Sequence, residues 1–334
     1  MKIYTIKDIA RLSGVSVTTV SRVLNHRPDV NRETRERVER IMQDCHFVGN
    51  ANARGLKQAE SDVVAVILRG RLNPFLNALA EAILQRTVSS DFTYVTEFID
   101  EKADEFQTAL RLYHEKRVKG FIFVGSRIDD RARVMDGVDV PMVFATVSTA
   151  GTLLERASSV TIDDRAMSRE AMVALLRSGH RRIAVFGGDR TGDDCHALRY
   201  QGVLDACRAC GCTFDESRYV ETRFSLKDAY DATRAFFALK GDTTAVFCMA
   251  DTVAMGVCRA LHDIGRQVPE DVSVVGFDGT ELGKYFVPRL TTVVQPVDEI
   301  AGQTVEVLTD MLENGAPPRH VVVSSELLMR ESFC

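Results

Sequence analysis

The residues near the amino terminus that are best suited to recognising another molecule are Thr18, Ser21 and Arg22, which share one face of an expected helix with Val17. Their hydroxyl groups can bind phosphates or base edges, and a guanidinium can form two hydrogen bonds with guanine. Such a small, polar and cationic face fits the major groove of DNA. A helical hairpin that turns the same face to solvent is the alternative explanation.

Two short helices are expected to position this face, over residues 6–12 and 17–24. Thr5 and Ser16 precede them as hydroxyl N-caps. Gly14 supplies the turn between them, because glycine enters the left-handed region without a Cβ clash. Two helices joined by so short a turn form a helix-turn-helix.

A third helix is expected over residues 32–47. Asn31 stands at its cap position, and Thr34 lies in its first turn, at the positive end of the helix dipole where a phosphate is favoured. Val38, Ile41 and Phe47 would bury against the first two helices. Asn25 ends the second of these.

The stretch TIKDIARLSGVSVTTVSRVLN, residues 5–25, closely resembles the head of the lactose-repressor-type (LacI-GalR) family of bacterial transcription regulators. The likeness continues through Val30, Thr34, Arg35, Val38, Phe47, Asn50, Ala53, Arg54 and Leu56. It implies a repressor that binds a palindromic double-stranded operator as a homodimer and answers to a small-molecule effector. The DNA-contacting residues that the head implies are Thr5, Ser16, Val17, Thr18, Thr19, Ser21, Arg22, Asn25, Asn31 and Thr34.

Residues 49–60 have the small and polar composition of a linker. In similar repressors this hinge becomes a helix on the operator, and a leucine wedges open a base step in the minor groove. Leu56 stands at the matching position, with Asn50, Ala53 and Arg54 as groove-facing or neighbouring residues. Gly49 replaces the family's usual proline, which predicts a looser hinge that proteases nick in the absence of operator.

Composition limits the class of protein. The chain has 334 residues, of which 45% are hydrophobic and 27% charged, as in ordinary soluble proteins. No apolar run approaches a membrane span and the start does not resemble a signal peptide, so a cytoplasmic location without membrane contact is expected. The net charge of −5 divides into +4 for residues 1–60 and −9 for the remainder. A basic head on an acidic body suits an anionic partner at one end.

From Asp62 onward short β-rich runs alternate with helical stretches, which predicts parallel sheets flanked by helices. The fold class is therefore α/β, with an all-α helix-turn-helix headpiece and, by the resemblance, a two-lobed periplasmic-binding-protein-like body. We expect the headpiece at 1–48, the hinge at 49–60 and the body at 61–334. The N-lobe would hold 61–160 and 290–318, and the C-lobe 161–289 and 319–334.

Ligands of parallel sheets bind beyond the carboxyl ends of the strands, where several aspartates fall in this sequence. Locally, Asp251 suits a helix cap and Asp278 a turn. The resemblance implies effector-binding roles for Phe75, Asp163, Arg199, Phe224, Phe247, Asp278 and Gln295. Two departures from the family are Ala250, where many members have Asn, and the stretch with Asp193 and Cys195.

The aspartates at 189, 193 and 194 disfavour an anionic ligand. A neutral sugar is the favoured effector, and a purine-type corepressor or a protein partner is the alternative. Cys207, Cys210 and Cys212 have metal-like spacing, but no second pair completes a zinc site, and the end of an ordinary helix explains them. No common catalytic motif is present. We therefore expect no enzyme activity, no metal and no cofactor.

Overall fold

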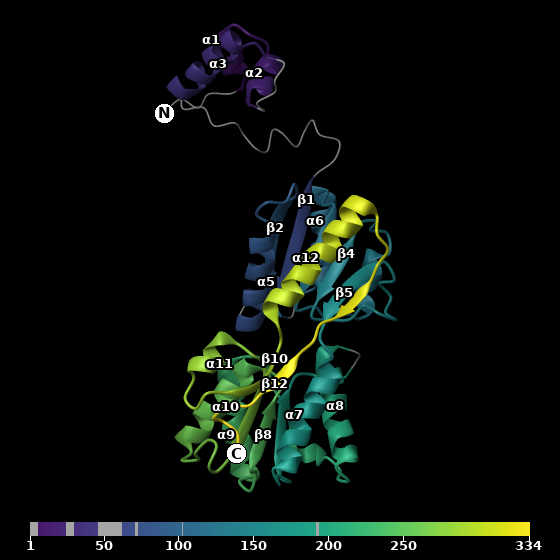
Figure 1. Ribbon diagram of the computed structural model, residues 1–334, viewed down its shortest axis with the longest axis vertical. Coiled ribbons are helices and arrows are strands. Elements are labelled where there is room, and N and C mark those ends of the chain that lie inside the picture. The colour runs from purple at the N-terminus through teal and green to yellow at the C-terminus, as the bar shows by residue number, and fades with distance from the viewer. Residues whose placement is uncertain (1–5, 25–29, 46–61, 71–72, 102, 192–193) are drawn as a thin grey trace. The chain divides into compact units, whose positions relative to one another are not determined.

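A computed structural model describes residues 6–24, 30–45, 62–70, 73–101, 103–191 and 194–334 (Figure 1). The chain separates between Ser61 and Asp62 into two compact units. The smaller unit, residues 1–61, is called the head and the larger, residues 62–334, the body.

The head contains the three expected helices α1 (Ile6–Ser13), α2 (Val17–Leu24) and α3 (Arg32–Asp44). Gly14 adopts a positive φ of 66° between α1 and α2, as the turn requires. The hydroxyl of Ser16 accepts a hydrogen bond from the Thr19 amide at 3.1 Å, which confirms the predicted cap of α2. The third helix ends at residue 44, before the predicted residue 47.

A small apolar core holds these helices together. Ile9 from α1, Val20 and Val23 from α2, and Val38 from α3 are all almost fully buried. Val20 and Val23 are three residues apart, so they lie on one stripe of α2, which turns toward Ile9 and Val38. The opposite face of α2 is thereby left toward solvent.

The first lobe of the body is built on a six-stranded sheet in which every strand pairs in parallel with its neighbours. Its strands, in spatial order, are β11 (His320–Val322), β5 (Ala157–Thr161), β4 (Met142–Ala145), β3 (Gly120–Val124), β1 (Val63–Arg69) and β2 (Thr93–Ile99). The helices of this lobe are α5 (Pro74–Arg86), α6 (Glu105–Lys116), the 3₁₀ turn η1 (Asp130–Met135) and α12 (Val297–Asn314). Figure 1 shows α12 alongside α5, although more than 200 residues separate them in sequence.

The second lobe repeats this plan with another six-stranded sheet. Its strands, in spatial order, are β12 (Glu326–Leu328), β10 (Thr291–Val294), β9 (Ser273–Asp278), β8 (Ala245–Cys248), β6 (Ile183–Gly187) and β7 (Tyr219–Glu221). Only the pairing of β12 with β10 is antiparallel. The helices of this lobe are α7 (Asp164–Arg177), α8 (Cys195–Ala209), the 3₁₀ turn η2 (Glu216–Arg218), α9 (Leu226–Leu239), α10 (Asp251–Asp263) and α11 (Glu281–Tyr285).

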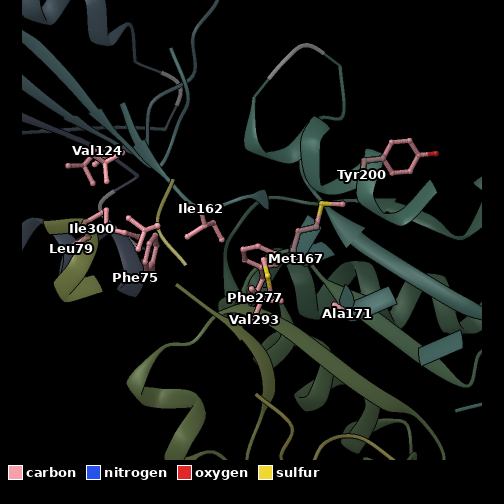
Figure 2. Close-up of a cluster of buried hydrophobic side chains, with 14 of the residues drawn as sticks. Phe75, Leu79, Val124, Ile162, Met167, Ala171, Tyr200, Phe277, Val293 and Ile300 are labelled. Carbon is pink, nitrogen blue, oxygen red and sulfur yellow. The ribbon is translucent and has the colours of Figure 1, made fainter. Parts of the chain in front are cut away.

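The inner strands of both sheets are buried along nearly their whole length, because helices cover both faces of a parallel sheet. Figure 2 shows part of a buried hydrophobic cluster that runs through both lobes, with Ile162 between Phe75 of the first lobe and Phe277 of the second. The predicted fold class is confirmed. No helix within the described ranges is long and apolar enough to cross a bilayer.

The predicted lobe boundaries are wrong for the last two crossings. We expected residues 290–318 in the N-lobe, but β10 belongs to the second sheet, paired in parallel with β9. We expected residues 319–334 in the C-lobe, but β11 pairs in parallel with β5 of the first sheet. The chain therefore crosses between the lobes after β5, after β10 and after β11. The short strands β10 and β11 carry no signal of their own for the sheet they join.

Helices α7 and α8 approach each other closely at Gly202. A Cβ atom placed there would lie 2.3 Å from the Arg165 carbonyl oxygen and 2.9 Å from the Ser168 Cβ. Neither atom can move without shifting the backbone of α7. The absence of a side chain at this position therefore sets the distance between the two helices.

We predict that Gly202→Ala lowers the free energy of unfolding by about 1–3 kcal/mol, because the added methyl group overpacks the α7–α8 contact. Gly302→Ala in α12 is the matched control, since its nearest neighbour is 3.7 Å away and alanine favours helix by up to about 1 kcal/mol. Urea unfolding of both variants measures the effect. Equal stability of the two variants would contradict the packing argument.

Candidate functional site

The outer face of α2 is the first candidate binding surface. Val17 is 41% exposed despite being apolar, and Thr18 and Arg22 are also exposed. The hydroxyl of Ser16 lies 2.9 Å from that of Thr19 and also caps the helix, so both groups are held in place at its N-terminus. The predicted groove-facing residues Val17, Thr18 and Arg22 thus form a surface that the head does not use for its own packing.

The N-terminus of α3 adds a second polar feature to the head. The Asn31 side chain accepts a hydrogen bond from the Thr34 amide at 2.8 Å, which confirms the predicted cap. Asn31 is exposed and Thr34 is half-buried. Other amides of the first turn remain available to an anion, as expected at the positive end of a helix.

The remaining predicted DNA contacts lie outside the described residues. These are Thr5, Asn25, Asn50, Ala53, Arg54 and Leu56, together with the side chain of Ser21. The hinge therefore stays a prediction, including the loosening attributed to Gly49.

The second candidate site is a cavity of about 780 Å³ in the body, lined from both lobes. It lies where strands of the two sheets end: Arg69 and Gly125 come at the ends of β1 and β3, and Gly188 and Asp278 at the ends of β6 and β9. Five of the seven predicted effector residues line it, namely Phe75, Arg199, Phe224, Asp278 and Gln295. Carboxyl ends of parallel strands are the expected place for a ligand.

Asp278 offers the cavity a polar side chain whose hydrogen bonding is incomplete among the described residues. The residue ends β9 at a φ of 117° and is buried. Its Oδ1 accepts a hydrogen bond of 2.8 Å from the Gln295 amide, but Oδ2 has no partner among the described residues. Burial raises the pKa of this carboxyl to about 8, against the opposing influence of Arg199. A buried polar atom without a partner costs free energy, which a ligand donor would recover.

Arg199 is fixed by three contacts inside the protein. Its Nε donates to Asp164 Oδ1 at 2.7 Å and its Nη1 donates to the Met249 carbonyl at 2.6 Å. The guanidinium lies over the ring of Phe277, 3.6 Å from the ring centroid. Both Arg199 and Asp164 are buried, so this ion pair anchors the arginine at the cavity wall without the freedom to follow a ligand.

Two predicted effector residues do not line the cavity. Asp163 is exposed and accepts a hydrogen bond from the Ala166 amide as the cap of α7, while its neighbour Asp164 turns inward. Phe247 is fully buried in the core, because alternate side chains of β8 point to the two faces of the sheet rather than past its end. Both assignments are therefore corrected.

Asp251 does not cap α10 through its side chain, contrary to expectation. Its buried carboxylate accepts hydrogen bonds from the amide and hydroxyl of Thr280 and from the hydroxyl of Thr292. It joins α10 to the segments after β9 and in β10. The cavity lining contains its neighbour Ala250 instead.

His196, which was not among the effector residues expected from the sequence, lines the cavity beside Phe224. The two rings stack with centroids 4.6 Å apart. They pack on Gly188, where a Cβ atom would lie 3.0 Å from the Phe224 ring and 3.2 Å from the imidazole. Burial lowers the pKa of His196 to about 4, so the ring is neutral near pH 7. The pair gives the cavity a flat, uncharged wall.

Cys207, Cys210 and Cys212 surround the end of α8, where Gly211 has a positive φ of 68°. This is the helix-end geometry expected from the sequence. Within the described part of the chain, no group of three or more His, Cys, Asp or Glu side chains is arranged to hold a metal ion.

Comparison with family models matches both parts of the chain. Residues 5–50 match the model of bacterial regulatory proteins of the lacI family, and residues 148–333 match a periplasmic binding protein-like domain. The HTH-type transcriptional regulator MalR of Clostridium butyricum is 31% identical, with 98% of each chain covered. The HTH-type transcriptional repressor PurR of Vibrio vulnificus is 29% identical, again over 98% of each chain.

Comparison with solved structures likewise finds transcriptional regulators. A transcriptional regulator CelR–cellobiose complex superposes with a TM-score of 0.74 at 28% identity, covering 98% of this chain and 99% of the other. The lac repressor dimer bound to operator and the anti-inducer ONPF superposes with a TM-score of 0.81 at 25% identity, covering 99% of both chains.

We predict that Asp278 makes the protein less stable as the pH rises. The pKa of Asp278 in the folded protein, about 8, exceeds its unfolded value. The contribution of this proton to stability is therefore fully present below about pH 4 and is lost as the pH rises through 8. Asp278→Asn should remove this contribution, so that unfolding free energy declines less between pH 7 and 9 than in the wild type. Urea unfolding at both pH values measures it.

Asp163→Asn is the control for this experiment, because that aspartate is exposed on the outside of α7. It should keep the wild-type decline between the two pH values. A decline of wild-type size in Asp278→Asn would show that Asp278 is already ionised at pH 7.

Proposed function

This chain belongs to the lacI family of bacterial regulatory proteins, and from that premise we propose that it represses transcription by binding a two-fold symmetric operator as a homodimer. It is a DNA-binding regulator of transcription. The observation that supports the operator-binding part of the proposal is the exposed face of α2, where apolar Val17 stands beside Thr18 and Arg22. Two such faces in a dimer would read two half-sites of a palindrome.

The charge of the head supports pairing. The first 60 residues carry a net charge of only +4, so one head neutralises few phosphates. A dimer doubles that contribution and adds the second half-site. The relative solved with operator is likewise a dimer.

The body also presents a surface suited to a second copy. Leu282, Tyr285 and Val287 lie in and just after α11 and are 57%, 79% and 88% exposed. Three large apolar side chains within six residues form an exposed patch of the kind that marks a protein interface. It supports the homodimer.

We propose a neutral sugar as the effector that fills the cavity. Seven carboxylic side chains but only four arginines line it, which disfavours an anion. The unpaired oxygen of Asp278 suits a sugar hydroxyl, which can accept a hydrogen bond from the protonated carboxyl as well as donate one, and the rings of Phe224 and His196 suit the apolar face of a sugar ring. The cavity volume of about 780 Å³ is ample for a disaccharide, and one similar regulator is solved with cellobiose.

A purine-type corepressor is the second candidate. The flat wall of Phe224 and the neutral His196 suits a planar heterocycle as well as a sugar, and one relative is named as the repressor PurR. Regulation through a protein partner is the third, and calorimetry against small molecules and candidate proteins separates it from the other two.

We predict that Arg22→Lys weakens binding to the operator by about 1–3 kcal/mol and relaxes preference at one base pair per half-site, because lysine keeps the charge but loses the two-pronged guanine contact. The operator is selected from random duplexes with the wild-type protein, and binding is followed by gel shift. Arg11→Lys, at an exposed position of α1, is the control and should keep the wild-type base-pair preference. Uniform weakening on all duplexes would mean that Arg22 contacts phosphate only.

We predict that a sugar which raises the melting temperature of the wild type by several degrees loses most of this effect in Asp278→Ala, because alanine leaves no polar atom at this position to hydrogen-bond the sugar. The probes are cellobiose, maltose, ribose and hypoxanthine in a thermal-shift assay. Asp163→Asn, outside the cavity, should respond like the wild type. Undiminished stabilisation of Asp278→Ala would refute the site, and a response to hypoxanthine alone would favour the purine.

A further inference from the structure

Arg127 reaches from the first lobe to the second at the edge of the cavity. It follows β3, and its Nη2 donates to Asp189 Oδ2 at 2.9 Å and to the Thr191 carbonyl at 3.2 Å. Its Nε lies 3.4 Å from Asp194 Oδ2. These three partners belong to the segment between β6 and α8 of the second lobe. Arg127, Asp189 and Asp194 all line the cavity.

The first-lobe end of this contact is held rigidly. The Arg127 amide donates to Glu105 Oε1 at 2.9 Å, and the Ser126 hydroxyl donates to Glu105 Oε2 at 2.6 Å. Glu105 is buried at the start of α6, where it accepts both bonds. Gly125 allows this turn, with a φ of 75° and no room for a Cβ beside Leu76. Only the side chain of Arg127 is therefore free to leave its partners.

The second-lobe end is equally prepared. Asp189 Oδ1 accepts hydrogen bonds from the amide and hydroxyl of Thr191, which leaves Oδ2 for the arginine. Asp194 Oδ1 caps α8 by accepting from the amides of His196 and Ala197, which leaves its Oδ2 facing Arg127. The two carboxylates thus hold a fixed place for one cation.

The charges agree with this geometry. Hydrogen bonds from Thr191, followed by the contact with Arg127, lower the pKa of Asp189. The contact with Asp189 raises the pKa of Arg127. The Asp194 side chain is only 4% exposed, so removing the arginine would leave a nearly buried carboxylate with fewer partners. The ion pair of Arg127 with Asp194 consequently contributes more to stability than an ion pair fully exposed to water.

We propose that Arg127 is a latch across the mouth of the cavity, which holds the two lobes closed and must release for an effector to enter or leave. The inference rests on the proposed effector function of the cavity. It adds a positioning residue that acts by fixing one lobe against the other. The backbone of Arg127 is bound to Glu105 of the first lobe and its side chain to Asp189 and Asp194 of the second. These contacts therefore do not depend on which neutral ligand occupies the cavity.

Hydrogen–deuterium exchange of the full chain without effector tests the latch. In Arg127→Met, amides of residues 69–70, 73–76, 125–128, 186–191 and 221–226, segments that contribute to the cavity lining, should exchange about three- to tenfold faster. Arg131→Met is the matched control, because Arg131 pairs with Asp129 of its own lobe and does not line the cavity. It should leave these rates unchanged. Wild-type rates in Arg127→Met would overturn the proposal.

A double-mutant cycle separates the latch from a general loss of stability. Asp189→Asn and Arg127→Met should each speed exchange, and the double variant should be little faster than Arg127→Met alone, because Asp189→Asn weakens a contact that Arg127→Met already removes. If the increases in exchange rate of the two single variants multiplied in the double variant, the two residues would act independently, and this would also overturn the proposal. Thermal unfolding of each variant shows whether the fold is kept.

The effector arm uses cellobiose, maltose, ribose and hypoxanthine. A probe that binds should dissociate about three- to tenfold faster from Arg127→Met than from Arg131→Met in stopped-flow measurements. Unchanged dissociation with faster exchange would overturn the gating role. Binding of none of these probes to the wild type would count against the proposed effector, while the exchange experiment would still decide whether Arg127 joins the lobes.

Discussion

The body depends on pairing the charges that its parallel sheets bring to their carboxyl edges. Arg199, Asp164 and Asp251 are buried near these edges, so each of these ionisable groups needs a partner inside the protein. Arg199 illustrates the rule, because Asp164 neutralises it, the Met249 carbonyl takes a second hydrogen bond and Phe277 supports its plane. Asp251 follows it with three hydrogen bonds from two threonines. These contacts make the walls of the cavity rigid.

Asp278 departs from that rule on one side only. Gln295 satisfies one carboxylate oxygen, and the other has no partner among the described residues. A buried polar oxygen left unpaired in this way lowers the stability of the empty protein and raises the affinity for a ligand that forms a hydrogen bond with it. The stack of His196 on Phe224 adds an apolar surface close by, since a neutral imidazole behaves there as a flat ring. One unsatisfied polar atom beside an otherwise satisfied wall is the arrangement expected of a selective binding site.

The head is stabilised by a small apolar core and by helix caps. Its core is a few aliphatic side chains, and capping bonds at Ser16 and Asn31 supply much of the local order. Such a small unit has little apolar surface to bury, so every residue that faces inward is needed for packing. The residues that remain outside, with Val17 and Arg22 among them, are exposed on the face of α2 opposite this core. Packing and recognition thus divide the same eight-residue helix between its two faces.

The sequence by itself determined the elements whose signals are local. Apolar residues on one face of each expected helix, among them Ile9, Val20 and Val38, predicted the head. Continuous apolar runs such as residues 63–68 predicted the buried strands. Family likeness added five residues of the cavity lining. Only the tertiary structure decided which sheet each late strand joins, that Asp164 rather than Asp163 turns inward, and that His196 and Arg127 border the cavity. Those outcomes depend on pairings between residues that are often far apart in the chain, such as Arg127 with Asp189, and no local pattern encodes such a partner.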